Sequence, residues 1–131
     1  MEIKLTHAES ETMFHTALCN GLGWISGYGL ELKFGKESYQ SAKENLKAKS
    51  GEGVAICYED VLLQILKDGG SLTLVDREGD DEEHTITLQD VHDRVQKTEA
   101  RFLIAMAEEQ DDAETADVIL QTVFFGEITF G

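Results

Sequence analysis

The chain of 131 residues is 41% hydrophobic and 28% charged, with a formal net charge of −15 at pH 7. Its length and apolar content suit one domain spanning residues 1–131 with a core of its own, and they argue against a chain that is disordered throughout. The acidity argues against direct binding to nucleic acid or to an anionic membrane surface, because both need clustered lysine and arginine side chains.

The N-terminal segment predicts a strand followed by a capped helix. Ile3 and Leu5 alternate with polar residues, the pattern of a short strand. Thr6 and Glu9 have the spacing of a capping box, in which each side chain accepts the other residue's backbone N–H. A helix should run from about residue 7 to residue 22 and end in a glycine-punctuated stretch. The glycines of that stretch are Gly21, Gly23, Gly27 and Gly29.

The middle of the chain predicts a strand, two helices and a hairpin. Residues 30–34 alternate strictly, as a half-buried strand does, and residues 36–49 are lysine-rich and polar, as an exposed helix is. The spacing of the apolar residues predicts a helix over residues 58–67, stopped by the glycine pair that follows. Two alternating segments flank the polar run 76–83 and predict an antiparallel hairpin within about residues 71–88.

The last third of the chain predicts three further helices. The first lies around Val91, Thr98 is expected to cap the second, and Asp111 or Asp112 is expected to cap the third. A final short strand around Ile128 should join the sheet. This order of elements indicates a single compact α+β domain, about half helical, with a small and mostly antiparallel sheet.

The charge is uneven along the chain. Residues 1–70 carry 10 acidic and 7 basic side chains, a net charge of −3, whereas residues 71–131 carry 16 acidic and 4 basic, a net charge of −12. Such a surface can attract a basic protein or a cation, and charge of one sign also keeps a protein soluble without any partner. The charge pattern leaves these interpretations open.

The cysteines and the N-terminal segment bear on the compartment. The chain has two cysteines, Cys19 and Cys57, whereas a secreted domain of this size often has more of them in pairs and follows a signal peptide. Residues 1–11 have no apolar run typical of a signal peptide, and no segment approaches the roughly 18 apolar residues of a membrane span. We therefore expect a cytoplasmic protein with two free, mostly buried thiols.

His15 and Cys19 are candidate catalytic residues because they lie four residues apart, on one face of the first predicted helix. An imidazole beside a thiol can activate a nucleophile, and both groups can ligate a metal. The sequence shows no orienting third group and no oxyanion site, so we expect both side chains to pack near the helix surface and core. No catalytic residue is assigned beyond these two candidates.

The polar run of the hairpin contains candidate ligands for a hard cation such as calcium, which prefers oxygen ligands. Asp81 occupies the slot where an EF-hand loop needs glycine, so the run does not follow that motif. We predict no cofactor beyond a weakly bound divalent cation. The candidate ligands are Asp76, Glu78, Asp80 and Asp81.

Two acidic runs, in residues 76–83 and 108–117, are candidates for an interaction surface. Carboxylates gathered on a small rigid domain can dock on a basic groove of another protein, since complementary charge speeds association. The usual alternative is a solvated face without a partner. The candidate interaction residues are Asp80, Asp81, Glu82, Glu83, Glu108, Glu109, Asp111 and Asp112.

Residues 15–23, HTALCNGLG, and residues 116–131, ADVILQTVFFGEITFG, resemble small uncharacterised proteins of tailed bacteriophages of aquatic bacteria. The resemblance implies no activity and no residue roles. It implies an accessory protein in the cytoplasm of a bacterial or phage-infected cell, with a host or virion protein as its partner.

The leading hypothesis is a non-enzymatic accessory or interaction protein whose acidic half binds a basic protein surface. Two alternatives stay open. One is a small metal-dependent or thiol-using enzyme that works through the acidic runs or through His15 and Cys19. The other is a structural or assembly subunit, which would need an exposed apolar face such as residues 118–130 could provide.

Overall fold

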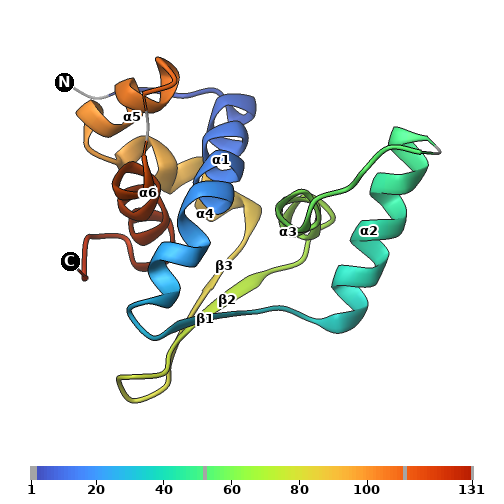
Figure 1. Cartoon of the computed structure of the whole chain (residues 1–131), viewed down its shortest axis with the longest axis horizontal. Coiled ribbons are helices and arrows are strands. Elements are labelled where there is room, and N and C mark those ends of the chain that lie inside the picture. Colours follow the sequence, from blue (N-terminus) through green and yellow to red (C-terminus); the bar gives the residue numbers. More distant parts are fainter. Residues whose placement is uncertain (1–2, 52, 111, 131) are drawn as a thin grey trace.

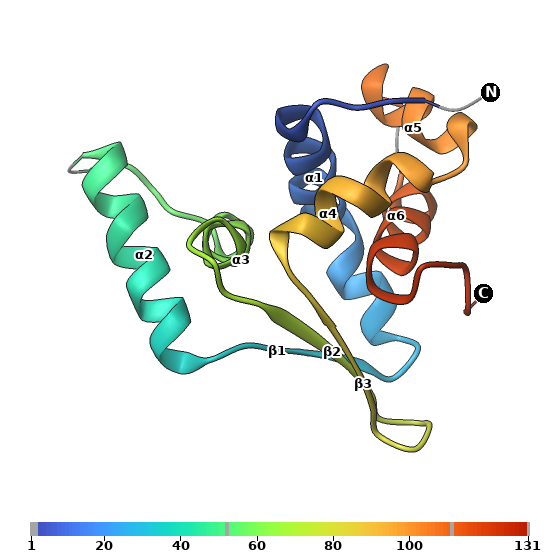
Figure 2. The ribbon, with the colours of Figure 1, turned by 180° about the vertical axis from the view of Figure 1, so that it is seen from behind.

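The computed structural model describes residues 3–51, 53–110 and 112–130. These residues form six α-helices, a short 3-10 helix and one three-stranded antiparallel sheet. The helices lie mainly on one face of the sheet (Figures 1 and 2). The predicted single α+β domain with a small antiparallel sheet is confirmed, and helices take up 60% of the chain where about half was expected.

The sheet consists of β1 (Leu30–Lys33), β2 (Leu72–Asp76) and β3 (Glu82–Ile86), in that spatial order. Strands β2 and β3 form the predicted hairpin. Side chains alternate between the two faces of a strand. The face toward the helices carries the apolar residues Leu30, Leu32, Leu72, Leu74 and Ile86. The opposite face carries Glu31, Lys33, Thr73, Val75, Glu83 and Thr85.

Two long helices, α1 (His7–Ser26) and α6 (Ala113–Phe125), form the centre of the helical layer. Each packs more extensively against the other than against any other element. They approach closely at Gly21, where a Cβ atom would lie 2.9 Å from the Cβ of Ala116 and 2.9 Å from the Cδ1 of Leu120. The core of the domain lies between these two helices and the sheet.

The other helices flank this pair. Helix α3 (Tyr58–Lys67) contacts α1 and β2, and α2 (Lys36–Ser50) packs on the outer side of α3, away from α6 (Figures 1 and 2). Helix α4 (Leu88–Arg94) follows β3, and a 3-10 helix (Val95–Lys97) connects it to α5 (Ala100–Ala107). Within the part of the chain that the structure describes, no helix is both long and apolar enough to cross a membrane.

Local capping signals in the sequence are confirmed at two helices. Thr6 Oγ1 accepts a hydrogen bond from the Glu9 N–H at 3.1 Å, and the Glu9 carboxylate accepts one from the Thr6 N–H at 2.9 Å, so α1 begins with the predicted capping box. Asp112 Oδ1 accepts from the Thr115 N–H at 3.0 Å and caps α6. Asp111, the alternative cap, lies outside the described residues.

The strands predicted at the two ends of the chain are wrong. Residues 3–6 form no regular element, and the Leu5 N–H donates to the Gln96 side chain at 3.2 Å instead of to a strand. Residues 126–130 are also irregular, because the Gln121 side chain satisfies the N–H groups of Thr129 and Phe130. An alternating pattern becomes a strand only where a neighbouring strand offers hydrogen bonds.

Two helix boundaries differ from the prediction. Helix α1 ends in the predicted glycine-punctuated stretch, with Gly27 as its C-cap, but it continues to Ser26, past the expected end near residue 22. Gly21 and Gly23 therefore lie inside the helix, and at Gly21 close packing against α6 leaves no room for a side chain. Thr98 does not cap α5; it follows the 3-10 helix, and Glu99 is the N-cap residue. Thr98 Oγ1 is buried without a hydrogen-bond partner among the described residues.

Candidate functional site

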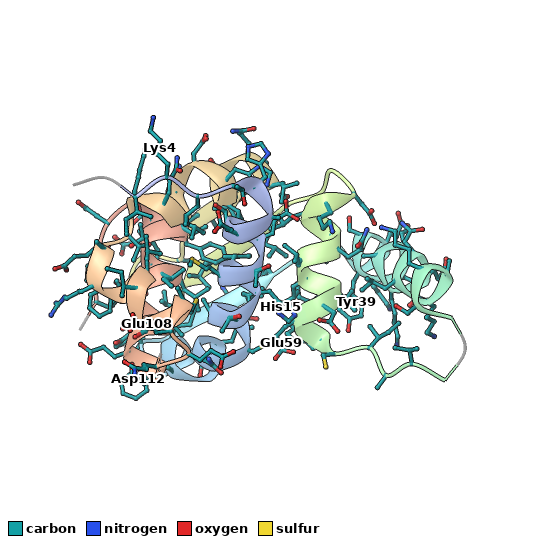
Figure 3. The ribbon with its side chains drawn as sticks, turned by 90° about the horizontal axis from the view of Figure 1, so that it is seen from above. Lys4, His15, Tyr39, Glu59, Glu108 and Asp112 are labelled. Carbon is teal, nitrogen blue, oxygen red and sulfur yellow. The ribbon has the colours of Figure 1, made fainter. Side chains whose placement is uncertain are left out.

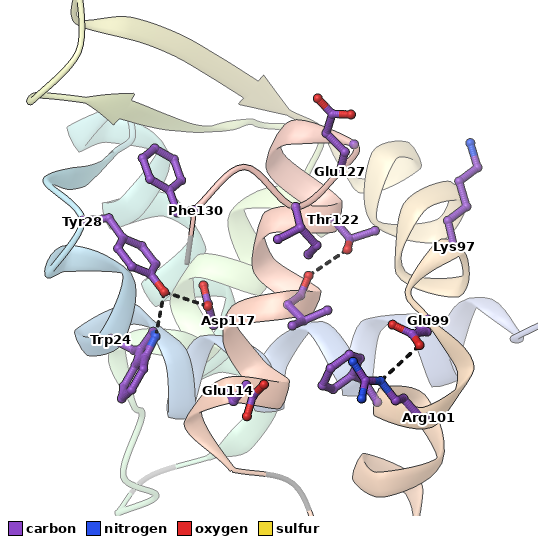
Figure 4. Close-up of a pocket in the computed structure, with 14 residues that line it drawn as sticks. Trp24, Tyr28, Lys97, Glu99, Arg101, Glu114, Asp117, Thr122, Glu127 and Phe130 are labelled. Carbon is purple, nitrogen blue, oxygen red and sulfur yellow. Dashed lines mark hydrogen bonds and ion pairs between the residues drawn. The ribbon is translucent and has the colours of Figure 1, made fainter.

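A groove of about 530 Å³ runs along α6 (Figure 4). Residues of α6 form its floor. One wall consists of the C-terminal end of α1 and residues 126–130, and the other consists of residues 97–102 at the start of α5. The fold therefore brings together four segments that are distant in the sequence. The lining includes Trp24, Tyr28, Arg101, Glu114, Asp117 and Glu127.

A nearly buried carboxylate, Asp117, organises one wall of the groove. Asp117 is only 6% exposed. The Tyr28 hydroxyl donates to Asp117 Oδ2 at 2.9 Å and accepts from the Trp24 indole N–H at 3.0 Å, while the Gln121 amide donates to Asp117 Oδ1 at 2.8 Å. Burial raises the pKa of Tyr28, and its hydrogen bond to Asp117 raises it further, so the hydroxyl remains a donor.

The C-terminal segment is held against the groove by Gln121. Its Oε1 atom accepts hydrogen bonds from the N–H groups of Thr129 and Phe130, each at 2.7 Å, and its amide nitrogen donates to the Phe130 carbonyl at 3.1 Å. The Phe130 ring stacks on Tyr28 with ring centroids 5.2 Å apart. These contacts hold in place the wall that carries Trp24 and Tyr28.

The groove exposes large apolar side chains. Trp24 and Ile128 are each 52% exposed, and both line the groove together with Val118 and Phe102. Trp24 is also the single tryptophan of the chain. Large side chains that stay exposed around a hollow are typical of binding sites rather than of an inert surface.

The charged lining of the groove is predominantly negative. Arg101 pairs with Glu99 at 3.1 Å and lies 4.5 Å from the centroid of the Phe102 ring, so it is already neutralised within its own wall. Besides this pair, the lining contains three carboxylates and one further cation, Lys97. These carboxylates belong to Glu114, Asp117 and Glu127 (Figure 4).

The acidic run of the hairpin is partly engaged in holding its own turn. Asp76 Oδ1 accepts from the N–H groups of Glu78 and Gly79 at 3.2 and 2.9 Å, and Arg77 pairs with Glu31 at 2.6 Å and with Asp81 at 3.4 Å. Among residues 3–51, 53–110 and 112–130, no group of three or more His, Cys, Asp or Glu side chains is placed to hold a metal ion. A divalent cation bound there stays a prediction.

The second acidic run lies at the connection between α5 and α6. Figure 3 shows Glu108 and Asp112 close to this connection. Asp112 is engaged as the cap of α6, and the backbone hydrogen bond from Thr115 lowers the pKa of its carboxyl. Glu109 has a backbone φ of 57°, in the left-handed region, where it ends the turn after α5.

The two acidic runs are placed at opposite ends of α6 rather than on one patch. His84 of β3 packs edge-on against Phe125, the last residue of α6, whereas Asp112 precedes its first residue. A helix of 13 residues spans roughly 20 Å. The seven of the eight predicted interaction residues that the structure describes, all but Asp111, are therefore not brought together directly.

The groove connects these two runs. Glu114 stands in the first turn of α6, close to the Asp112 cap. At the other end, Glu127 lines both the groove and a smaller pocket of about 230 Å³ beside the turn of the hairpin, where Asp76 and Glu82 also contribute. Carboxylates thus follow α6 from Asp112 to Glu82, and we call this set with the groove the acidic track.

The structure supplies a third group for the His15 and Cys19 pair. His15 Nε2 lies 2.6 Å from Asp60 Oδ1 at the start of α3, and Figure 3 shows His15 and Glu59 between the two helices. Partial burial raises the pKa of the Cys19 thiol, and the nearby carboxylates of Glu59 and Asp60 raise it further. This environment opposes the thiolate that a nucleophile needs.

Both cysteines are exposed, so the prediction of mostly buried thiols is wrong. The buried stripe of α1 passes through Leu18 and Gly21, and it leaves Cys19 on the neighbouring, solvent-facing side. Cys57 is the N-cap residue of α3, outside the core.

Most residues of the groove were not singled out from the sequence. One signal was present: Asp117 and Gln121 are polar residues four apart within the apolar segment 116–125, a spacing that places both on one helix face. Trp24 and Tyr28 show the same spacing in the glycine-rich stretch. Only the fold shows that these two pairs meet across α1 and α6.

Comparison of the chain with protein-family models, with curated protein sequences and with solved structures found no match.

Proposed function

We propose that this protein is a non-enzymatic interaction protein that docks on a basic surface of another protein through the acidic half of its chain. The observation that supports this proposal is the acidic track along α6, where exposed Trp24 and Ile128 are surrounded by carboxylates. An apolar centre with a charged rim is the usual anatomy of a protein interface. The sign of the rim selects a basic partner.

The four cations of the acidic half offset only part of the charge of its 16 carboxylates. Arg77, Arg94 and Arg101 each pair with carboxylates of their own chain. Among the ion pairs of the described residues, none includes Glu108, Glu114 or Glu127. Carboxylates without a counter-charge raise the local negative potential and can steer a basic protein toward the surface.

The setting of the proposal is the cytoplasm of a bacterial or phage-infected cell, which the resemblance of the sequence to small phage proteins predicts. The protein would act there as an accessory protein on a host or virion partner. No cofactor takes part in the proposed interaction.

The test is capture of proteins from a bacterial lysate on immobilised wild-type protein, read by mass spectrometry at low and at moderate salt. The test variant replaces one carboxylate from each acidic run, Glu82→Gln with Glu108→Gln, at the two ends of α6. The matched control, Glu37→Gln with Glu44→Gln on α2, removes the same charge from the side of the domain away from α6.

We expect a basic protein that is retained at low salt, released at moderate salt, lost from the test variant and kept by the control. At 0.1 M salt, attraction between exposed charges is screened beyond about 10 Å, and more salt shortens this range. Release of the partner at moderate salt therefore indicates docking driven by charge. Capture that is unchanged by salt, equal loss in both variants, or an empty eluate would contradict the proposal.

A further inference from the structure

We infer that the groove along α6 binds one extended, arginine-containing segment of the partner protein, with a guanidinium group stacked on the indole ring of Trp24. This rests on the proposed function and specifies which part of the acidic track makes contact and which chemistry it recognises. The occupant is a segment of another protein.

The shape of the groove suits an extended chain. It is open along α6, and its floor follows the helix from Glu114 to the C-terminal segment beyond Phe125. The roughly 20 Å length of α6 corresponds to about six residues of extended chain at 3.3–3.6 Å each. A segment of that length can reach Glu114 at one end and Glu127 at the other.

Trp24 is held ready for stacking. Its indole N–H donates to the Tyr28 hydroxyl, and Tyr28 is in turn fixed by its hydrogen bond to Asp117 and by stacking on Phe130. The ring is oriented by its own chain while half of the residue stays exposed. An ordered side chain loses little conformational entropy on binding, so its contact energy contributes to affinity with little offset.

The charges of the groove select a cation. Both oxygens of Asp117 already accept hydrogen bonds from Tyr28 and Gln121, so this carboxylate contributes its charge rather than a direct contact. Glu114 and Glu127 project at the rim and can accept hydrogen bonds from the segment (Figure 4). Arg101 and Glu99 pair with each other, so Lys97 is the remaining cation of the lining. Its single positive charge can balance only one of these three carboxylates.

Arginine fits better than lysine because the guanidinium group is planar. It can lie flat on an indole ring and still donate bidentate hydrogen bonds to a carboxylate, whereas an ammonium group is a compact point charge. The opposite wall already places an arginine over an aromatic ring, since Arg101 Cζ lies 4.5 Å from the centroid of the Phe102 ring. Trp24 presents a larger ring with no such cation among the described residues.

The probe is a dye-labelled peptide of about ten residues in which arginine alternates with serine, a length that exceeds the floor of the groove. Binding is followed by fluorescence anisotropy of the dye and, in the wild type, by the emission of Trp24, which is the single tryptophan. Companion peptides carry lysine or uncharged citrulline in place of arginine.

The variants are Trp24→Ala and the pair Glu114→Gln with Glu127→Gln, and the matched control is again Glu37→Gln with Glu44→Gln. Thermal unfolding of each variant checks that the fold is intact. We expect the arginine peptide to change Trp24 emission and to bind Trp24→Ala about 3- to 30-fold more weakly, the range of a cation–π contact. The Glu114 and Glu127 pair should also weaken binding, and the control should not.

Equal affinity of the arginine peptide for the wild type, Trp24→Ala and the Glu114 and Glu127 pair would overturn the groove as the site. Equal affinity of the arginine and lysine peptides would overturn the stacking mode. If the lysate capture described above still depends on Glu82 and Glu108, the proposed function survives these failures. If peptide binding in the groove and charge-dependent capture from the lysate both fail, the proposed function is overturned as well.

Discussion

Gly21 and Gly23 lie two residues apart in α1, and the structure predicts opposite effects of alanine at the two positions. A Cβ atom at Gly21 would lie 2.9 Å from Ala116 Cβ and 2.9 Å from Leu120 Cδ1. A Cβ atom at Gly23 would meet nothing within 4 Å. The pair therefore forms a matched experiment on the contact between α1 and α6.

The magnitudes follow from two opposing effects. Alanine in place of glycine in a helix interior stabilises the folded state by about 0.5–1 kcal/mol, because it restricts the unfolded chain. Carbon atoms pack at about 3.5–4.0 Å, so at Gly21 the new methyl group must displace α6 or Leu120, and overpacking of a core costs about 1–3 kcal/mol. We expect Gly21→Ala to lower the free energy of unfolding by about 1–2 kcal/mol, and Gly23→Ala to raise it by about 0.5 kcal/mol.

The assay is urea unfolding followed by far-ultraviolet circular dichroism, which reports the helices and avoids dependence on nearby Trp24. For a domain of this size, 1 kcal/mol corresponds to a change in Tm of about 4 °C, so thermal unfolding gives a second readout. The slope of the free energy of unfolding against urea concentration should be the same in both variants as in the wild type, while the midpoint shifts. A Gly21→Ala protein as stable as the wild type, or a shift of both variants in the same direction, would refute the packing explanation.

Two further predictions concern α6. Gln121→Leu removes the acceptor of the Thr129 and Phe130 N–H groups. We therefore expect these two amides to exchange hydrogen much faster and the free energy of unfolding to fall by about 1–3 kcal/mol. Unchanged protection of the two amides from exchange would contradict the role of Gln121. The lowered pKa of Asp112 means that its cap stabilises the folded state above about pH 4 and that this contribution is lost as the pH falls through that pKa. In urea unfolding, the difference between the wild type and Asp112→Ala should therefore shrink toward acid pH, and a constant difference would be inconsistent with this.

The acidic track was only partly predictable. The sequence shows the excess of carboxylates after residue 70 and suggests a basic partner, but it places the candidate residues in two separate runs. The structure puts these runs at opposite ends of α6 and shows that Trp24, Tyr28 and Glu127 lie between them. Distances between residues far apart in the chain depend on helix packing, which no local pattern encodes.

The sequence by itself determined the elements that are stabilised by near neighbours. The Thr6–Glu9 capping box, the bounds of α3 at Tyr58 and Lys67 and the hairpin all agree with the structure, because each depends on hydrogen bonds or apolar spacing within a few residues. For the cap of α6 the sequence leaves Asp111 and Asp112 open, and Asp112 fills that role.

The tertiary structure alone decided the features that need a distant partner. Residues 3–5 and 126–130 have strand-like patterns, yet they bind the side chains of Gln96 and Gln121 instead of a neighbouring strand. Gly21 has the appearance of a helix terminator and is a packing residue, because α6 crosses α1 at that point. A backbone group takes whichever partner the packed fold brings within reach, and that choice is made only when α1, α6 and the sheet assemble.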